Sequence, residues 1–136
     1  MATDLTTTIS LHRFVDELMA GLLPRAVSRK SIIINQIDRE IEVSSDENLL
    51  AFVLWNLLDR TVDCTQSECI HIESVRMDDA KTMIRVRNAG VYFYRSCADC
   101  FRQVQDAAEK IGATISIDYN RDTNTTIALT LHRKAA

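Results

Sequence analysis

The chain has 136 residues, of which 46% are hydrophobic and 26% charged, and its formal net charge is −3. This length supports a single domain over residues 1–136 with a substantial hydrophobic core, and the lack of a basic cluster argues against nucleic-acid binding. No apolar run approaches the roughly 20 residues that span a bilayer, and the N-terminus lacks a signal-peptide pattern. We therefore expect a cytoplasmic protein, or the cytoplasmic domain of a larger membrane sensor, without direct membrane insertion.

Hydrophobic periodicity predicts three helices separated by pairs of strands. In chain order these are a helix over 10–23, strands over 31–37 and 40–43, a helix over 46–63, strands over 69–77 and 82–88, a helix over 97–111, and strands over 113–119 and 125–132. Residues 1–8 are expected to be flexible. The order predicts an α/β (α+β) two-layer sandwich, with three helices on one face of a mixed, mostly antiparallel sheet.

Local signals refine these boundaries. Pro24 places the end of the first helix near residue 23, with a kinked continuation to about residue 28 as the alternative. Asp38-Arg39 separates the first two strands and predicts a tight hairpin. Ser44 begins a Ser-x-x-Glu sequence, which predicts a capping box for the helix over 46–63, and Gly112 is placed for a left-handed C-cap.

The sequence also predicts which side chains form the core. The helix over 46–63 is apolar over much of its circumference, so we expect it to be the buried central helix. Alternation in the strands predicts that the following residues face inward: Ile70, Ile72, Ile84, Val86, Ile115, Ile117, Ile127, Leu129 and Leu131.

The four cysteines leave three interpretations open. Cys97 and Cys100 have the spacing of a zinc or redox half-site, and Cys64 and Cys69 could supply the other half. Cys97 and Cys100 are also in phase with the apolar stripe of a predicted helix, where cysteine packs as a small hydrophobe. We favour this packing role over zinc binding and redox chemistry. The three histidines are expected at the surface or at sheet edges, with no metal site, and they are His12, His71 and His132.

The stretch from Asn48 to Thr65 resembles the asparagine box of the GHKL ATPases, above all that of histidine-kinase catalytic domains. In the family an apolar residue precedes Asn-Leu-Leu, one variable residue and Asn-Ala. Asn56 stands at the first family asparagine, and Arg60 stands at the second, which is the family's magnesium ligand. From Ile9 to Arg133 the order of elements also resembles that domain. The resemblance implies a Bergerat-like fold and an ATP site.

Other positions depart from the family pattern. The aspartate that binds the adenine amino group is Asn88 here, Gly90 is retained, and the second glycine of that box is Tyr92. Helix-patterned sequence follows almost at once, so the family's mobile lid over the phosphates is missing. We therefore assign no catalytic residue and no metal ligand. The residues left at the family's positions, Asn56, Arg60, Asn88 and Gly90, are expected to form a remnant nucleotide pocket that binds ATP weakly or not at all.

Three functions fit this pattern. The first is a degenerate, non-catalytic domain that acts in signal transduction through a protein partner, which could be a response-regulator receiver, kinase dimerisation helices or a second copy of itself. The second is an atypical ATPase in which Arg60 replaces magnesium as the counter-charge. The third is a small-ligand sensor that uses the remnant nucleotide pocket. An unrelated α/β domain with a similar pattern is the remaining alternative.

Overall fold

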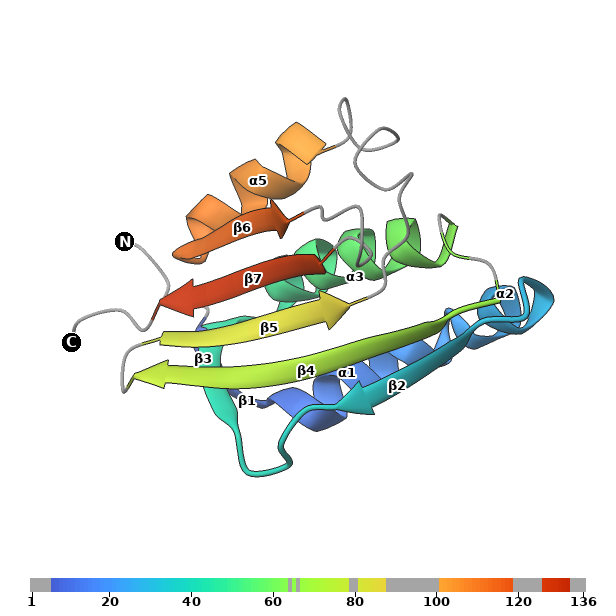
Figure 1. Ribbon diagram of the computed structural model, residues 1–136. Helices are drawn as coiled ribbons and strands as arrows, with labels where there is room; N and C mark the ends of the chain where they lie inside the picture. Colours follow the sequence, from blue (N-terminus) through green and yellow to red (C-terminus); the bar gives the residue numbers. More distant parts are fainter. Residues whose placement is uncertain are drawn as a thin grey trace.

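The computed structural model describes residues 6–63, 65, 67–78, 81–87, 101–118 and 126–132. A five-stranded sheet has the order β2-β4-β5-β7-β6, with β2 parallel to β4 and the other neighbours antiparallel. The helices lie on one face of this sheet (Figure 1), so the predicted two-layer architecture is confirmed. The elements are β1 Thr6–Ser10, α1 Leu11–Ala20, α2 Leu23–Ser28, β2 Ile32–Gln36, β3 Glu42–Asp46, α3 Glu47–Asp63, β4 Cys69–Asp78, β5 Lys81–Arg87, α5 Phe101–Lys110, β6 Ala113–Asp118 and β7 Thr126–His132.

Helix α3 is the central helix of the core, as predicted. Its buried side chains are Leu50, Val53, Leu54, Leu57, Leu58, Thr61 and Val62. The predicted capping box is wrong, because Ser44 lies within β3 and Asp46 caps the helix instead. The Asp46 carboxylate accepts hydrogen bonds from the backbone N–H groups of Asn48 at 3.0 Å and Leu49 at 3.2 Å. Such bonds satisfy two of the N–H groups that the first helical turn leaves unpaired.

The sheet turns its apolar side chains toward the helices in continuous rows. Ile72 of β4 lies beside Val86 of β5, and Val86 lies beside Ile127 of β7. Each of these three side chains is at most 2% exposed. The row continues to Ile117 of the edge strand β6, which is half-buried and packs against the same core. The inward alternation predicted from the sequence is therefore confirmed.

The N-terminal strands correct one prediction. Strands β2 and β3 do not form a hairpin, because β2 pairs parallel with β4 and β3 pairs antiparallel with β1 in a separate two-stranded sheet. Ile9 and Val43 lie opposite each other in that small sheet and are both buried. Burial of these two apolar side chains favours the pairing of β1 with β3. Residues 6–8 belong to β1, and the flexibility expected for residues 1–8 stays a prediction.

The first predicted helix is two helices, and the kinked continuation to residue 28 is the correct alternative. Helix α1 ends at Ala20, and Pro24 lies in the first turn of α2, where its missing N–H costs no helical hydrogen bond. Between them, Gly21 lies against the indole of Trp55 on α3. A Cβ at Gly21 would come 3.1 Å from two atoms of that ring, so the glycine permits the close approach of α1 to α3.

Gly112 has a φ of +69°, as expected for a left-handed residue that ends a helix. Its N–H donates to the carbonyl of Glu109, and its own carbonyl accepts from His132 on β7. We expect Gly112→Ala to lower the free energy of unfolding by about 1–2 kcal/mol, because a Cβ is strained in this conformation. Gly112→Asn should lose less, since asparagine tolerates the left-handed region. Urea denaturation measures both, and equal losses for the two variants would show that the backbone conformation is not the cause.

Candidate functional site

The second half of α3 carries the two predicted site residues that the structure describes. Asn56 and Arg60 are one helical turn apart, which places them on the same side of the helix, and both are half-buried. The Asn56 side-chain Nδ2 donates to the backbone carbonyl of Phe52 at 2.7 Å, so this nitrogen is engaged within its own helix. The other two predicted residues, Asn88 and Gly90, lie outside the described residues, as do Tyr92 and the stretch expected to lack a lid.

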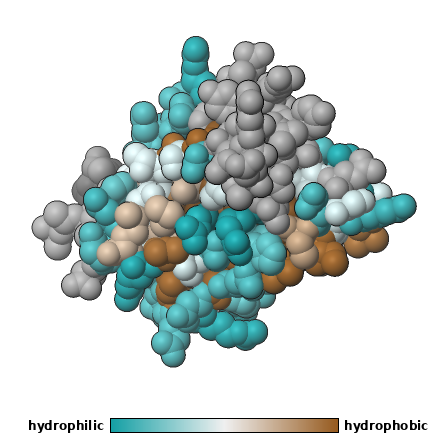
Figure 2. Space-filling view, in the orientation of Figure 1, coloured by the Kyte–Doolittle hydropathy of each residue, from teal (hydrophilic) through white to brown (hydrophobic). Residues whose placement is uncertain are grey.

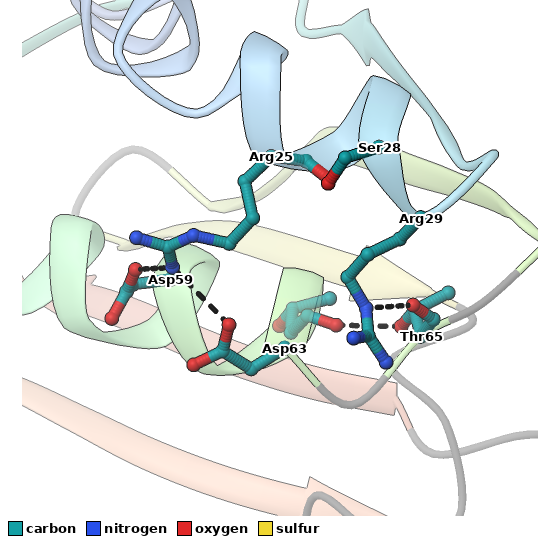
Figure 3. Close-up of polar contacts among 7 residues, drawn as sticks. Arg25, Ser28, Arg29, Asp59, Asp63 and Thr65 are labelled. Atoms are coloured by element: carbon teal, nitrogen blue, oxygen red, sulfur yellow. Dashed lines mark hydrogen bonds and ion pairs between the residues drawn. The ribbon is translucent and has the colours of Figure 1, made fainter.

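Two carboxylates on the exposed side of the same helical turns bind a cation from α2 (Figure 3). The Arg25 guanidinium donates to Asp59 and, at 3.2 Å, to Asp63 Oδ1. The hydrogen bond and charge of Asp59 raise the pKa of Arg25. Asp59 and Asp63 are the carboxylates nearest to Arg60 in the sequence, and in the structure both bind Arg25.

A second contact ties the end of α2 to the segment that follows α3. The Arg29 Nε donates to the backbone carbonyl of Thr65 at 2.8 Å (Figure 3), and the N–H of Ser67 donates to the carbonyl of Arg29. The buried Thr65 hydroxyl donates in turn to the Thr61 carbonyl at 2.6 Å. These contacts join the segment that follows α3 both to the end of α2 and to α3 itself.

We expect Arg25→Gln to lower the thermal midpoint modestly. The pKa of Arg25 is raised in the folded state, so its contribution is present below the pKa of the unfolded chain and is lost only as pH rises through the higher folded value. The loss should thus be the same across neutral pH and should shrink in high salt, which screens exposed charges. Arg13→Gln is the matched control, because Arg13 is 83% exposed and its ion pair with Glu17, at 3.6 Å, lies within α1. Equal shifts for the two variants in differential scanning fluorimetry would contradict a specific role of Arg25.

Sequence reasoning missed this contact because Arg25 is 34 residues away from Asp59. A signal was present nonetheless. Asp59 and Asp63 are spaced one turn apart on a helix whose other side is apolar, so they had to project together toward solvent or a neighbouring element. Arg25 on α2 and Arg29, which caps the C-terminal end of α2, have the same spacing. Two cations and two carboxylates at matching helical spacing favour a contact between the two helices.

Known structures share this architecture. The Acinetobacter baumannii histidine kinase AdeS matches with a TM-score of 0.82 at 12% identity, over 99% of this chain and 70% of that one. Full-length ShkA in complex with AMPPNP matches at 0.80 and 13% identity, over 100% and 33%. The histidine kinase ThkA matches as a nucleotide-free catalytic domain at 0.78 and 16% identity, over 96% and 99%, and in complex with the response regulator protein TrrA at 0.73 and 17% identity, over 95% and 42%.

The chain has the fold of a histidine-kinase catalytic domain. The resemblance drawn from the asparagine box is thereby confirmed at the level of fold. No protein-family model matches the sequence, and no curated protein matches it. At identities of 12–17% the similarity shows the shared fold, and what the histidine-kinase fold does in this chain depends on its own side chains.

The other predicted ligand residues do not form a metal site within the described part of the chain. No group of three or more His, Cys, Asp or Glu side chains among the described residues is placed to hold a metal ion. Cys69 is half-buried on β4, whereas Cys64, Cys97 and Cys100 lie outside the described residues, so the choice between packing, zinc and redox roles stays a prediction. No helix of the described residues is long and apolar enough to cross a membrane.

Proposed function

We propose that this histidine-kinase fold acts as a non-catalytic module of signal transduction, which binds a protein partner and does not transfer phosphate. The observation that carries the proposal is Arg60, which lies one turn after Asn56 on α3. The resemblance of this sequence to the asparagine box implies that the family's magnesium ligand would stand there. Phosphoryl transfer depends on positioning and on metal ions that neutralise the phosphates. A side chain that repels the metal at this position removes a central part of that chemistry.

The side chain of Arg60 does not suit a magnesium ion. Magnesium requires oxygen ligands in near-octahedral geometry, and a guanidinium offers only N–H donors and a positive charge. Asp59 and Asp63, the carboxylates nearest in sequence, are held by Arg25 on the side of α2. We therefore derive no reaction step through a bound metal in this chain.

The connection between β5 and α5 supports the same proposal. In the family this connection carries glycine-rich segments and the lid over the phosphates. Here it comprises only residues 88–100, in which Gly90 is the single glycine and Tyr92 replaces the next. A glycine allows backbone to approach a ligand without a Cβ, so this sequence offers fewer such approaches. The remnant nucleotide pocket is therefore proposed to bind ATP weakly.

A protein partner is the role that remains for such a domain. ThkA, which shares the fold, is known in complex with a response regulator. We propose a partner of this kind for the chain, either a receiver domain, the dimerisation helices of a kinase or a second copy of the same chain. We also propose a cytoplasmic location, since the structures that share the fold include the cytoplasmic segment of the histidine kinase QseC.

Isothermal titration calorimetry with ATP, in magnesium and in EDTA, tests the proposed loss of magnesium-dependent ATP binding. We expect no saturable binding at micromolar ATP in either buffer. An active histidine-kinase catalytic domain, titrated in parallel, shows that the assay detects binding. Micromolar, magnesium-dependent binding by this chain would contradict the proposal. Equally tight binding in EDTA would instead support the atypical ATPase, in which Arg60 supplies the counter-charge.

A further inference from the structure

Strand β2 forms one edge of the five-stranded sheet, and its other side pairs with no described strand. The segment from Ser31 to Ile37 contains four isoleucines and no charged residue or proline. Exposed sheet edges are ordinarily protected by charges, prolines or bulges, because an unprotected edge invites pairing with another strand. The opposite edge, β6, carries the polar exposed residues Thr114 and Ser116 and ends at Asp118. Of the two edge strands, β2 is therefore the one better suited to pair with a further strand.

The hydrogen-bond pattern shows which backbone groups are available on β2. The N–H of Ile32 donates to the carbonyl of Glu68, and Ile32 lies opposite Cys69 on β4 in a parallel register. In such a ladder alternate residues direct both backbone groups to the same neighbour. Ile32, Ile34 and Gln36 thus face β4, which leaves the N–H and C=O groups of Ile33 and Asn35 directed toward the free edge.

Apolar side chains surround the start of this edge. Leu23 and Val27 lie one turn apart on α2 and are 45% and 71% exposed, and Ile32 is 61% exposed. Figure 2 shows hydrophobic residues gathered at the end of the molecule where Figure 1 places α2 and the start of β2. Exposed apolar residues that adjoin an unprotected edge are typical of an interaction surface.

We propose that two copies of the chain pair through β2, antiparallel about a two-fold axis at Ile34. Ile34 then lies opposite Ile34 of the partner subunit, and Ile33 lies opposite Asn35 of the partner subunit. This register matches the backbone groups at the free edge. The N–H and C=O groups of Ile33 and Asn35 face the partner subunit and form the hydrogen-bonded pairs, whereas Ile34 forms a non-hydrogen-bonded pair. The two sheets become continuous, and symmetry repeats each contact on the other side of the axis.

The charges at the two ends of β2 favour a second copy over other strands. From Leu18 to Ile37 the chain has three cations, Arg25, Arg29 and Lys30, and no acidic residue. Immediately after Ile37 come Asp38 and Glu40, on either side of Arg39. An antiparallel pair brings the basic start of one strand to the acidic end of the other. Lys30 comes shortly before β2, with a φ of +58°, and Asp38 comes shortly after it. In the register centred on Ile34, Lys30 of one copy and Asp38 of the partner subunit therefore lie just beyond the paired strands at the same end, and both residues are exposed in the single chain.

Hydrogen exchange of the intact chain at several concentrations tests the pairing. We expect the amides of Ile33 and Asn35 to become protected as concentration rises, together with a doubling of the mass measured by light scattering. The amides of Ile32, Ile34 and Gln36 should be protected at every concentration, because they bond to β4. A chain that stays monomeric at high concentration, or amides of Ile33 and Asn35 that exchange equally fast throughout, would overturn the proposal and leave the edge for a different partner.

Variants test the register. Ile34→Lys places like charges opposite each other on the axis and should weaken dimerisation by more than about tenfold, whereas Thr114→Lys on the other edge should not change it. Lys30→Glu and Asp38→Lys should each weaken dimerisation, and the double variant should recover it. Circular dichroism confirms that each variant is folded. Failure of the double variant to recover dimerisation would exclude this register. The nucleotide titration is unaffected by any of these results, because it concerns other residues.

Discussion

Replacing Leu57 with alanine should lower the free energy of unfolding by about 2–5 kcal/mol, the range for a fully buried leucine. Leu57 is 2% exposed and belongs to α3, the helix at the centre of the core. Its side chain belongs to the hydrophobic core that α3 shares with the sheet and α5, so removing it leaves a cavity in a close-packed interior. Urea denaturation, followed by far-ultraviolet circular dichroism, measures the loss.

The matched control is Leu23→Ala, which makes the same chemical change at a leucine that is 45% exposed on α2. In dilute solution, where the proposed dimer is dissociated, we expect this variant to lose much less stability than Leu57→Ala. A loss below about half a kcal/mol for Leu57→Ala, typical of surface substitutions, would remove Leu57 from the core and contradict the packing of α3.

The fold was predictable to the extent that local pattern determines it. Leu50, Val53, Leu57 and the other buried positions of α3 follow the helical period, and alternate residues of β4, β5, β6 and β7 follow the period of a strand. Because each of these elements buries one side against the same core, periodicity in the sequence reports directly on burial. The order of the elements then limits the architecture to few alternatives.

The N-terminal strands were not predictable in the same way. Two short β-rich runs around Asp38-Arg39 have the pattern of a hairpin, yet β2 pairs with β4 and β3 pairs with β1. The choice of partner depends on tertiary contacts, here the burial of Ile9 with Val43, and neighbouring residues do not specify it. Thr6, Thr7 and Thr8 carry no hydrophobic signal, so the local pattern did not predict strand β1.

The candidate site was also predictable only in part, namely where local spacing determines it. The positions of Asn56 and Arg60 on one side of a helix followed from their spacing. The pairing of Arg25 with Asp59 and Asp63 depends on how α2 packs against α3, and only the structure shows it. Asp59 and Asp63 are the carboxylates nearest to Arg60 in the sequence, and their contact with a cation 34 residues or more away is not visible in the local pattern. The contributions of Asn88 and Gly90 to the remnant nucleotide pocket stay predictions.

Arg60→Asn should fail to restore ATP binding, even though it returns the family's magnesium ligand to α3. An amide oxygen at this position can bind the metal, but the metal alone holds only part of the nucleotide. Tight binding also needs backbone donors around the phosphates, and the stretch 88–100 has one glycine from which to build such a cradle. The difference from an active kinase domain should therefore remain large, with no saturable binding at micromolar ATP.

Calorimetry of Arg60→Asn in magnesium and in EDTA measures this, with Arg13→Asn as the matched control. Arg13 is 83% exposed on α1, so its replacement changes the net charge equally without touching α3. Both variants should behave as the unmodified chain does, and an unchanged thermal midpoint would show that they are folded. Micromolar, magnesium-dependent binding by Arg60→Asn alone would show that a single side chain blocks the nucleotide. The chain would then retain a latent ATP site, because the stretch 88–100 would supply the remaining contacts.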